Sequence, residues 1–331
     1  YQQQDVQAQA PQVQKTTPEN NSVIDDEDEV LKLGEPSKAL DTPAIVSAPS
    51  NNLISVKTDT FDLRINPRGG DLVYAALLNH KAKVKSDLPF VLLQNNEQRH
   101  YIMQSDLNGL GNKQRIMLSS QKDAYVLEPG QNQLEVHLAA NVDGVELVKT
   151  FTFTRGSHHI KVNYQLNNQS DRTLTTNFIG LIKRDASEDP SQNESLGMKA
   201  FLGGAFSTDE KRYQKIDFDD IKNKGFKADS VGGWAAMLQH YFIASWIPSQ
   251  TEKSFFSTRS DRAGNHIVGF SGSEYVVSPG QQTNLAADIY LGPKIQKDMQ
   301  VVAPNLELTV DYGFLWFIAQ PIFWLLGVIH S

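Results

Sequence analysis

The fold is decided by the stretch Phe61-Asp62-Leu63-Arg64-Ile65-Asn66-Pro67-Arg68-Gly69-Gly70. Its first six residues alternate between apolar and polar side chains, and successive side chains of a strand point to opposite faces of a sheet. The proline and the two glycines that follow are typical of a tight turn. A further apolar run at residues 72–78 then predicts a second strand beside the first, and therefore an antiparallel sheet with one buried face.

Similar runs recur along the chain. Asp143-Gly144 is a strong signal for a two-residue hairpin turn between two of them. A nearly continuous apolar run at residues 174–182 predicts one further strand, and a polar loop follows at residues 183–195. Other strands are predicted at residues 134–138, 145–153, 160–166, 241–248, 254–259, 266–270, 275–278 and 285–291. We therefore predict a mainly β chain in which one large antiparallel β-sandwich occupies residues 53–305.

One helix is expected at the end of this body, over residues 293–303. Pro293 suits the first turn of a helix, where its missing N–H is not needed. Ile295, Met299 and Val302 recur at helical spacing, and Pro304 ends the pattern. The apolar side of this helix should pack on the sandwich.

The last segment, residues 306–331, has a different character, because no side chain from Phe314 to Ile329 is charged. This run of sixteen residues is shorter than the roughly 20 that span a bilayer, and its polar side is weak for a helix that faces water. We predict an amphipathic helix lying in the membrane interface, with a buried helix at the edge of the globular core as the alternative. The expected membrane contacts are Phe314, Leu315, Trp316, Phe317, Ile318, Ile322, Phe323, Trp324, Leu325 and Leu326.

The first 52 residues form the opposite extreme in composition. They carry nine acidic residues and three lysines, and so account for six of the seven net negative charges of the chain. A stretch rich in Gln, Pro and acidic residues cannot bury enough apolar surface to offset its ordering entropy. We predict a disordered linker. The chain begins without Met and has no secretory apolar segment, so we expect it to be part of a longer protein.

Few residues point to chemistry. The chain has no Cys, which removes thiol catalysis, disulfides and zinc–thiolate sites, and we expect no metal, no cofactor and no nucleic-acid partner. His158 and His159 are adjacent, so on a strand they point to opposite faces, and surface histidines are the simpler interpretation. Trp234, Phe242 and Trp246 suit a sugar- or peptide-binding platform, but aromatic residues of a sandwich are more often core.

Two strings of residues carry a family resemblance. They are residues 232–248, which read GGWAAMLQHYFIASWIP, and residues 308–323, which read LTVDYGFLWFIAQPIF. Weaker similarity is found at residues 53–59, 66–71, 122–127, 201–208 and 279–281. Residues 53–331 therefore resemble, in order, the large periplasmic domain and interfacial helix of the YidC family of membrane protein insertases of Gram-negative bacteria.

The resemblance implies a specific architecture and role. Such proteins have a first transmembrane helix, a flexible linker, a mutarotase-like β-super-sandwich in the periplasm, an interfacial helix and a membrane core whose polar groove receives nascent segments. The chain would be the periplasmic portion, at the bacterial inner membrane, of a protein that is not an enzyme. It would help to insert, fold and assemble inner-membrane proteins. Its implied partners are nascent inner-membrane proteins, the Sec translocon and the phospholipid bilayer, while the groove residues lie in a core that the chain lacks.

Two alternatives of other classes stay open. The first is a carbohydrate-binding or epimerase-like super-sandwich protein with a membrane-anchoring tail. An epimerase would need a carboxylate and a histidine that meet across an open cleft. The second is a periplasmic binding or scaffolding module that the tail only anchors. The charge-free tail is the feature that separates these readings, because an epimerase would work without it.

Overall fold

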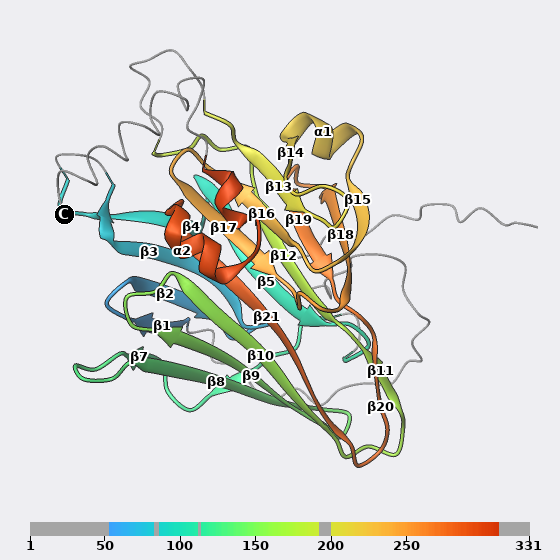
Figure 1. Cartoon of the computed structure of the whole chain (residues 1–331). Coiled ribbons are helices and arrows are strands. Elements are labelled where there is room, and N and C mark those ends of the chain that lie inside the picture. Colours follow the sequence, from blue (N-terminus) through green and yellow to red (C-terminus); the bar gives the residue numbers. More distant parts are fainter. Residues whose placement is uncertain (1–52, 83–85, 112–113, 192–199, 311–331) are drawn as a thin grey trace, which may run out of the picture.

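The structure is a computed structural model, and it describes residues 53–82, 86–111, 114–191 and 200–310 (Figure 1). The predictions for the linker at residues 1–52 and for the tail after Val310 lie outside the described residues.

The described residues form two large sheets and one small one. The larger sheet has ten strands, in the order β15 (Lys227–Val231), β18 (Lys253–Ser260), β19 (His266–Ser271), β12 (Phe178–Arg184), β5 (Arg99–Leu107), β4 (Pro89–Asn96), β3 (Asp71–Lys81), β2 (Phe61–Asn66), β1 (Ile54–Lys57) and β7 (Ala124–Val126). The second has nine, in the order β14 (Gln214–Asp217), β13 (Gly203–Ser207), β16 (Trp234–Leu238), β17 (Phe242–Ile247), β21 (Gln282–Pro293), β10 (His159–Asn168), β9 (Val145–Thr154), β8 (Gln133–Val142) and β6 (Ser119–Ser120). β11 (Leu174–Thr176) and β20 (Tyr275–Val277) form the small sheet.

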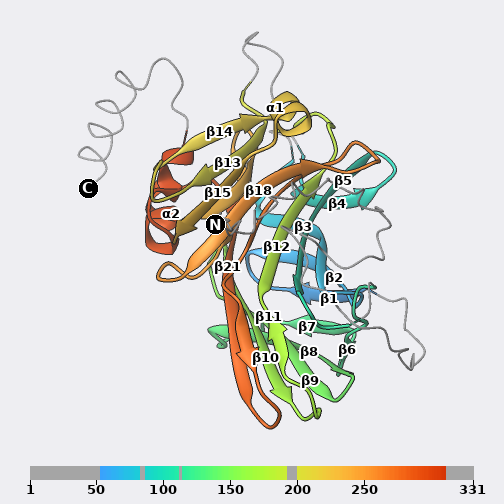
Figure 2. The ribbon, with the colours of Figure 1, turned by 90° about the vertical axis from the view of Figure 1, so that its right-hand side faces the viewer.

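The two large sheets pack face to face, as Figures 1 and 2 show. Strand pairing is antiparallel among the described strands except between β1 and β7. One apolar core lies between the sheets and takes alternate residues from each strand, for example Phe61, Leu63 and Ile65 of β2. The fold class predicted from the alternating runs, a mainly β sandwich, is thereby confirmed.

Local turn chemistry explains why the strands pair as they do. Asp143 and Gly144, between β8 and β9, have φ angles of 51° and 83°. Two consecutive positive φ angles characterise the hairpin turn whose twist matches that of the flanking strands. The predicted hairpin is confirmed, and its register aligns Val142 with Val145.

Two boundaries predicted from the sequence are wrong. The single strand predicted at residues 174–182 is divided between β11 and β12. The break is at Asn177, which belongs to neither strand and whose side-chain amide donates to Ser271 Oγ and to Gly272 O. The predicted helix starts later than Pro293, since α2 covers Gln296–Val302 and Pro293 is the last residue of β21, paired with Phe242.

Two other short helices complete the described fold. The helix α1 (Phe218–Asn223) follows β14, and the side chain of Asp217 caps it by accepting from Asp220 N. The 3-10 helix η2 (Leu306–Thr309) follows α2 after Asn305, which has a left-handed φ of 64°.

Candidate functional site

The aromatic residues suggested as a binding platform are core residues. Trp234, Phe242 and Trp246 are 0%, 6% and 1% exposed, so no ligand surface is formed by them. The Trp246 indole lies inside the sandwich and donates through Nε1 to Leu181 O at 3.0 Å. The prediction that these residues are core is confirmed, and the platform interpretation is wrong.

The histidine pair is only partly as expected. His159 lies at the surface side of β10, with Nε2 3.0 Å from Asp288 Oδ2. His158 is buried instead, packed edge-on against Phe61, and its ring fills the space above Gly292. Burial lowers the pKa of His158 to about 4, so the ring is neutral at ordinary pH. The sequence prediction of a surface histidine is wrong here because a neutral imidazole packs like an aromatic ring.

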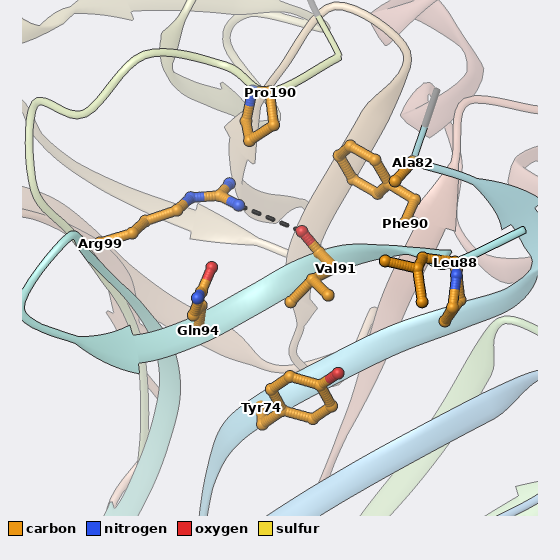
Figure 3. A pocket seen from close by; sticks show the side chains of 9 residues that line it. Tyr74, Ala82, Leu88, Phe90, Val91, Gln94, Arg99 and Pro190 are labelled. Carbon is orange, nitrogen blue, oxygen red and sulfur yellow. Dashed lines mark hydrogen bonds between the residues drawn. The ribbon is translucent and has the colours of Figure 1, made fainter. Parts of the chain in front are cut away.

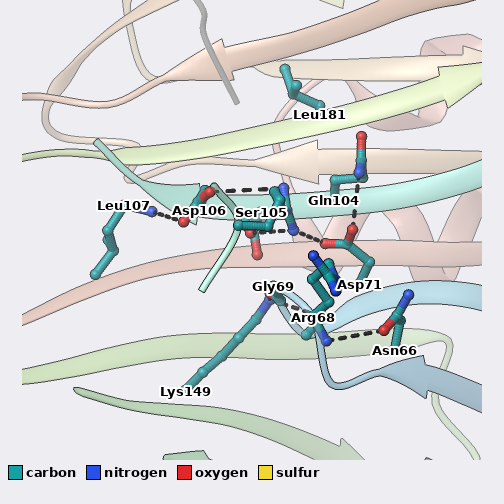
Figure 4. A network of polar contacts seen from close by, with 12 residues as sticks. Asn66, Arg68, Gly69, Asp71, Gln104, Ser105, Asp106, Leu107, Lys149 and Leu181 are labelled. Atoms are coloured by element: carbon teal, nitrogen blue, oxygen red, sulfur yellow. Dashed lines mark hydrogen bonds and ion pairs between the residues drawn. The ribbon is translucent and has the colours of Figure 1, made fainter. Parts of the chain in front are cut away.

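A cluster of charged residues lies where the β2–β3 turn meets β5 and β9 (Figure 4). The Arg115 guanidinium donates to Asp71, and its Nη1 lies 3.9 Å from Asp106 Oδ2. Gln104 also contacts Asp71, since its Nε2 donates to the other carboxylate oxygen, Oδ2, at 2.9 Å. Gly69 is required here, since its φ is 75° and a Cβ on it would overlap the Arg115 guanidinium.

Lys149 of β9 joins the cluster from the other sheet. Its Nζ donates to Gly69 O at 2.9 Å and to Gly70 O at 2.8 Å. It also faces the rings of Phe151 and Tyr164, at 4.9 and 5.2 Å from their centroids. Complete burial lowers the pKa of Lys149 to about 7. This side chain therefore ties the turn of one sheet to the middle of the other.

The charged cluster is sealed rather than open. Asp71, Asp106, Arg115 and Lys149 are at most 5% exposed. Burial is also the main reason that the pKa of Asp106 is raised. A general acid or base has to reach the proton of its substrate, and these groups contact one another and the backbone instead. We interpret the cluster as a structural tie between the sheets.

The C-terminal segment offers a different kind of site. Within β16 and β17, alternate residues such as Met237 and Trp246 face the core between the sheets, while Trp234, Ile243 and others face outward. That outer face is apolar too. α2 and η2 cover it, as Figures 1 and 2 show, and bury Met299, Ala303 and Leu306 against it. The predicted packing of the helix on the sandwich is confirmed for Met299, whereas Ile295 is 41% exposed.

A hydrogen bond joins this docked segment, which we define as Gln296–Val310, to the sandwich, and another stabilises it internally. The Trp234 indole Nε1 donates to Pro304 O at 3.1 Å. The Thr309 hydroxyl, itself buried, donates to Leu306 O at 2.7 Å. Val310, the last described residue, packs partly against the same apolar cluster. The site therefore holds the chain in a defined place shortly before the residues predicted to contact the membrane, which begin at Phe314.

Sequence reasoning missed part of this docked segment. Leu306 and Thr309 stand at the start of the range predicted for the tail, yet both are buried on the sandwich. The signal that would have found them is the absence of alternation at residues 234–238, since a run that is apolar on both faces needs a cover on its outer side.

The ten residues predicted to contact the membrane, from Phe314 to Leu326, lie outside the described residues. Among the residues that are described, no helix has the length and apolar character needed to cross a membrane.

Comparison with known proteins points to one family. The family model described as YidC periplasmic domain matches residues 53–325. A membrane protein insertase YidC from Pseudomonas fluorescens (strain SBW25) is 42% identical over 321 residues, covering 95% of this chain and 57% of the relative. That of Pseudomonas aeruginosa (strain PAO1) is 41% identical over 322 residues, covering 89% of this chain and 55% of the relative.

Solved structures resemble the chain more distantly. A galactose mutarotase-like protein from Lactobacillus casei has a TM-score of 0.48 at 10% identity, covering 72% of this chain and 100% of that one. A galactose mutarotase related enzyme from Lactobacillus acidophilus has a TM-score of 0.46 at 9% identity, covering 72% of this chain and 97% of that one.

This chain spans little more than half the length of the curated relatives that it matches. The match is nonetheless long and continuous. With the family model covering residues 53–325 and 42% identity across 95% of the chain, the chain belongs to the YidC family and carries its periplasmic domain.

Proposed function

We propose that the chain is the periplasmic part of a membrane protein insertase of the bacterial inner membrane. In this role it helps a membrane core to insert, fold and assemble integral membrane proteins, alone or beside the Sec translocon. The names of relatives that are 41–42% identical over most of the chain support this proposal. The chain itself would supply no catalysis, since its task is to position and to dock.

The observation that carries the proposal is the docked segment Gln296–Val310. It buries one face of α2 and η2 on the nine-stranded sheet and is separated by the three residues Asp311-Tyr312-Gly313 from the charge-free run from Phe314 to Ile329. This attachment fixes where the described chain leaves the sandwich. We propose that residues 314–329 lie in the membrane interface, with Trp316 and Trp324 at the level of the headgroups.

The sealed charged cluster offers no acid or base group for the epimerase-like alternative. A sugar epimerase needs acid and base groups that touch a dissolved substrate, and Asp71, Asp106 and Lys149 are enclosed between elements of the two sheets. Their contacts instead favour a scaffold whose shape is fixed.

A chimera tests the proposal. The matching periplasmic part of the Pseudomonas aeruginosa insertase is replaced by this chain, in cells depleted of their own insertase, and growth is measured. We expect the chimera to restore growth. Met299→Asp should abolish that rescue, because an unpaired carboxylate cannot be buried beneath α2 without undocking it.

The matched control is Val301→Asp on the same helix, where the side chain is 87% exposed. This variant should grow as the unaltered chimera does. Immunoblotting shows whether each protein accumulates. Failure of the unaltered chimera despite normal accumulation contradicts the proposal, and equal growth of both variants shows that the docked segment is not what the function requires.

A further inference from the structure

A separate cavity of about 350 Å³ lies at the edge of the sandwich, between the β3–β4 hairpin and the loop at Pro190 (Figure 3). It is at the small end of the range for ligand pockets, which hold about 300–1,000 Å³. Most of its lining is apolar, and its polar members are Tyr74, Gln94 and Arg99; the other lining residues are Ala82, Leu88, Pro89, Phe90, Val91 and Pro190.

Arg99 is the unusual member of this lining. Its side chain is only 5% exposed, yet no carboxylate of the described residues forms an ion pair with it. Nη1 donates to Val91 O at 3.1 Å, while Nε and Nη2 are buried without a hydrogen-bond partner. Nε and Nη2 form one edge of the guanidinium plane, and their parallel N–H groups are the fork that binds a carboxylate or phosphate through two bonds.

A second buried arginine near Arg99 makes an anion at this place more favourable. Arg184 lies on Tyr101, with the guanidinium 5.0 Å from the ring centroid, and Arg99 lies 5.4 Å from the same centroid. Burial first, and the charge of Arg184 second, lower the pKa of Arg99 to about 10, so Arg99 stays charged at neutral pH. A buried charge without a partner is costly, and proteins retain one chiefly where it binds something.

The nearby carboxylates are already engaged by other donors. Asp189 accepts from the Gln239 side chain at 2.8 Å and from His240 N at 2.7 Å. Asp185 accepts from His100 N at 2.7 Å and from the Ser187 hydroxyl. These carboxylates order the loop around Pro190, and neither forms an ion pair with the Arg99 fork.

We propose that this cavity binds a small amphiphilic anion. Its oxyanion head takes the Nε–Nη2 edge of Arg99, and its short apolar chain lies along Leu88, Phe90 and Val91. Figure 3 shows the guanidinium between Pro190 and Val91. Both fork nitrogens are shielded from solvent, so the anion reaches them only after a shift of neighbouring atoms. Carboxylate and phosphate heads share this chemistry, so a fatty acid and a phosphate-headed lipid fragment are its two sources.

The test is calorimetric titration of the full chain with octanoate, octyl phosphate and uncharged octanol. At least one of the anions should bind at least about tenfold more tightly than octanol, because charge-assisted hydrogen bonds contribute about 1.5–3 kcal/mol. Stronger binding of octanoate identifies a fatty acid as the source, and stronger binding of octyl phosphate identifies a phosphate head. Weak binding of both anions, no tighter than octanol, overturns the proposal.

Three variants locate the site. Arg99→Met should weaken the binding of the anions about tenfold or more and leave octanol unchanged, without lowering the thermal midpoint, because it removes an unpaired charge. Ala82→Phe should fill the cavity and weaken all three ligands. The control Arg172→Met changes an exposed arginine remote in sequence from the cavity lining and should alter nothing. Unchanged anion affinity in Arg99→Met, or in Ala82→Phe, contradicts the assignment.

Discussion

Replacing Trp246 by alanine should lower the free energy of unfolding by about 3–5 kcal/mol, the usual cost of truncating a large buried aromatic residue. Trp246 is 1% exposed and lies against Phe178 and Phe270 at centroid distances of 5.6 and 6.2 Å. The indole also packs on Gly180, where an added Cβ would come within 2.8 Å of it. Truncation therefore leaves a cavity in the core and removes the hydrogen bond that the indole donates to Leu181 O.

Denaturant titration of both proteins measures this loss. The control is Tyr241→Ala, which removes a comparable ring that is 53% exposed and should cost less than about 1 kcal/mol. A loss below about 1 kcal/mol for Trp246→Ala would place the indole outside the core and reopen the ligand-platform interpretation.

Arg115→Met should also cost about 3–5 kcal/mol, because it leaves charges buried without a partner. Arg115 is 4% exposed and is the cation beside both Asp71 and Asp106. Its loss leaves the carboxylates of Asp71 and Asp106 close together in the protein interior. Among the described residues, Lys149 is the cation that then remains beside them, and burial lowers its pKa to about 7.

Denaturant titration measures the loss of stability in Arg115→Met and in a control variant. Arg172→Met removes an exposed arginine that pairs with Asp171 at 3.8 Å, and it should cost less than about 1 kcal/mol. Adding Asp71→Asn to Arg115→Met should restore part of the lost stability, since it removes one of the unpaired charges. If Arg115→Met costs no more than the control, the cluster is not a tie between the sheets.

Alternation predicted those strands that bury one face only. In β2 and β10, each apolar residue is buried and each polar residue between two of them is more exposed, so the period of two is visible in the sequence. The Asp143-Gly144 turn was equally readable, because a hairpin of this kind requires positive φ at both positions.

Two strands that are buried on both faces, β5 and β13, escaped the same reasoning. In β5, eight of nine residues are buried, and they include the polar residues Arg99, Gln104 and Asp106. Gln104 and Asp106 contact Asp71 and Arg115, which no local sequence pattern brings to this strand. β13 reads Gly-Gly-Ala-Phe-Ser and is buried throughout, although glycine is unfavourable in strands. Close packing explains the glycines, since a Cβ on Gly203 would lie 2.6 Å from Ile216 O.

The helix start and the docking site show the limits of local signals. Pro293 fits a first helical turn in isolation, but it ends β21, and its carbonyl accepts from the Tyr290 hydroxyl at 2.8 Å. Tertiary contacts therefore override the local preference. The charge-free run from Phe314 to Ile329 is visible in the sequence, and its contact with the membrane stays a prediction. The docking of Leu306 and Thr309, in contrast, depends on an apolar outer face of β16 and β17 that only the folded sheet reveals.

Liposome flotation tests the central claim, which is that the residues after the docked segment bind the membrane. The full chain is compared with a chain ending at Val310, using zwitterionic and anionic vesicles at low and moderate salt. Apolar burial contributes roughly 25 cal/mol per Å², and the run from Phe314 to Ile329 carries no basic cluster, so binding should depend little on salt or lipid charge. We expect the full chain to float with both vesicle types and its Trp fluorescence to shift to the blue. The shortened chain should stay at the bottom of the gradient. Equal flotation of the two chains would contradict the account.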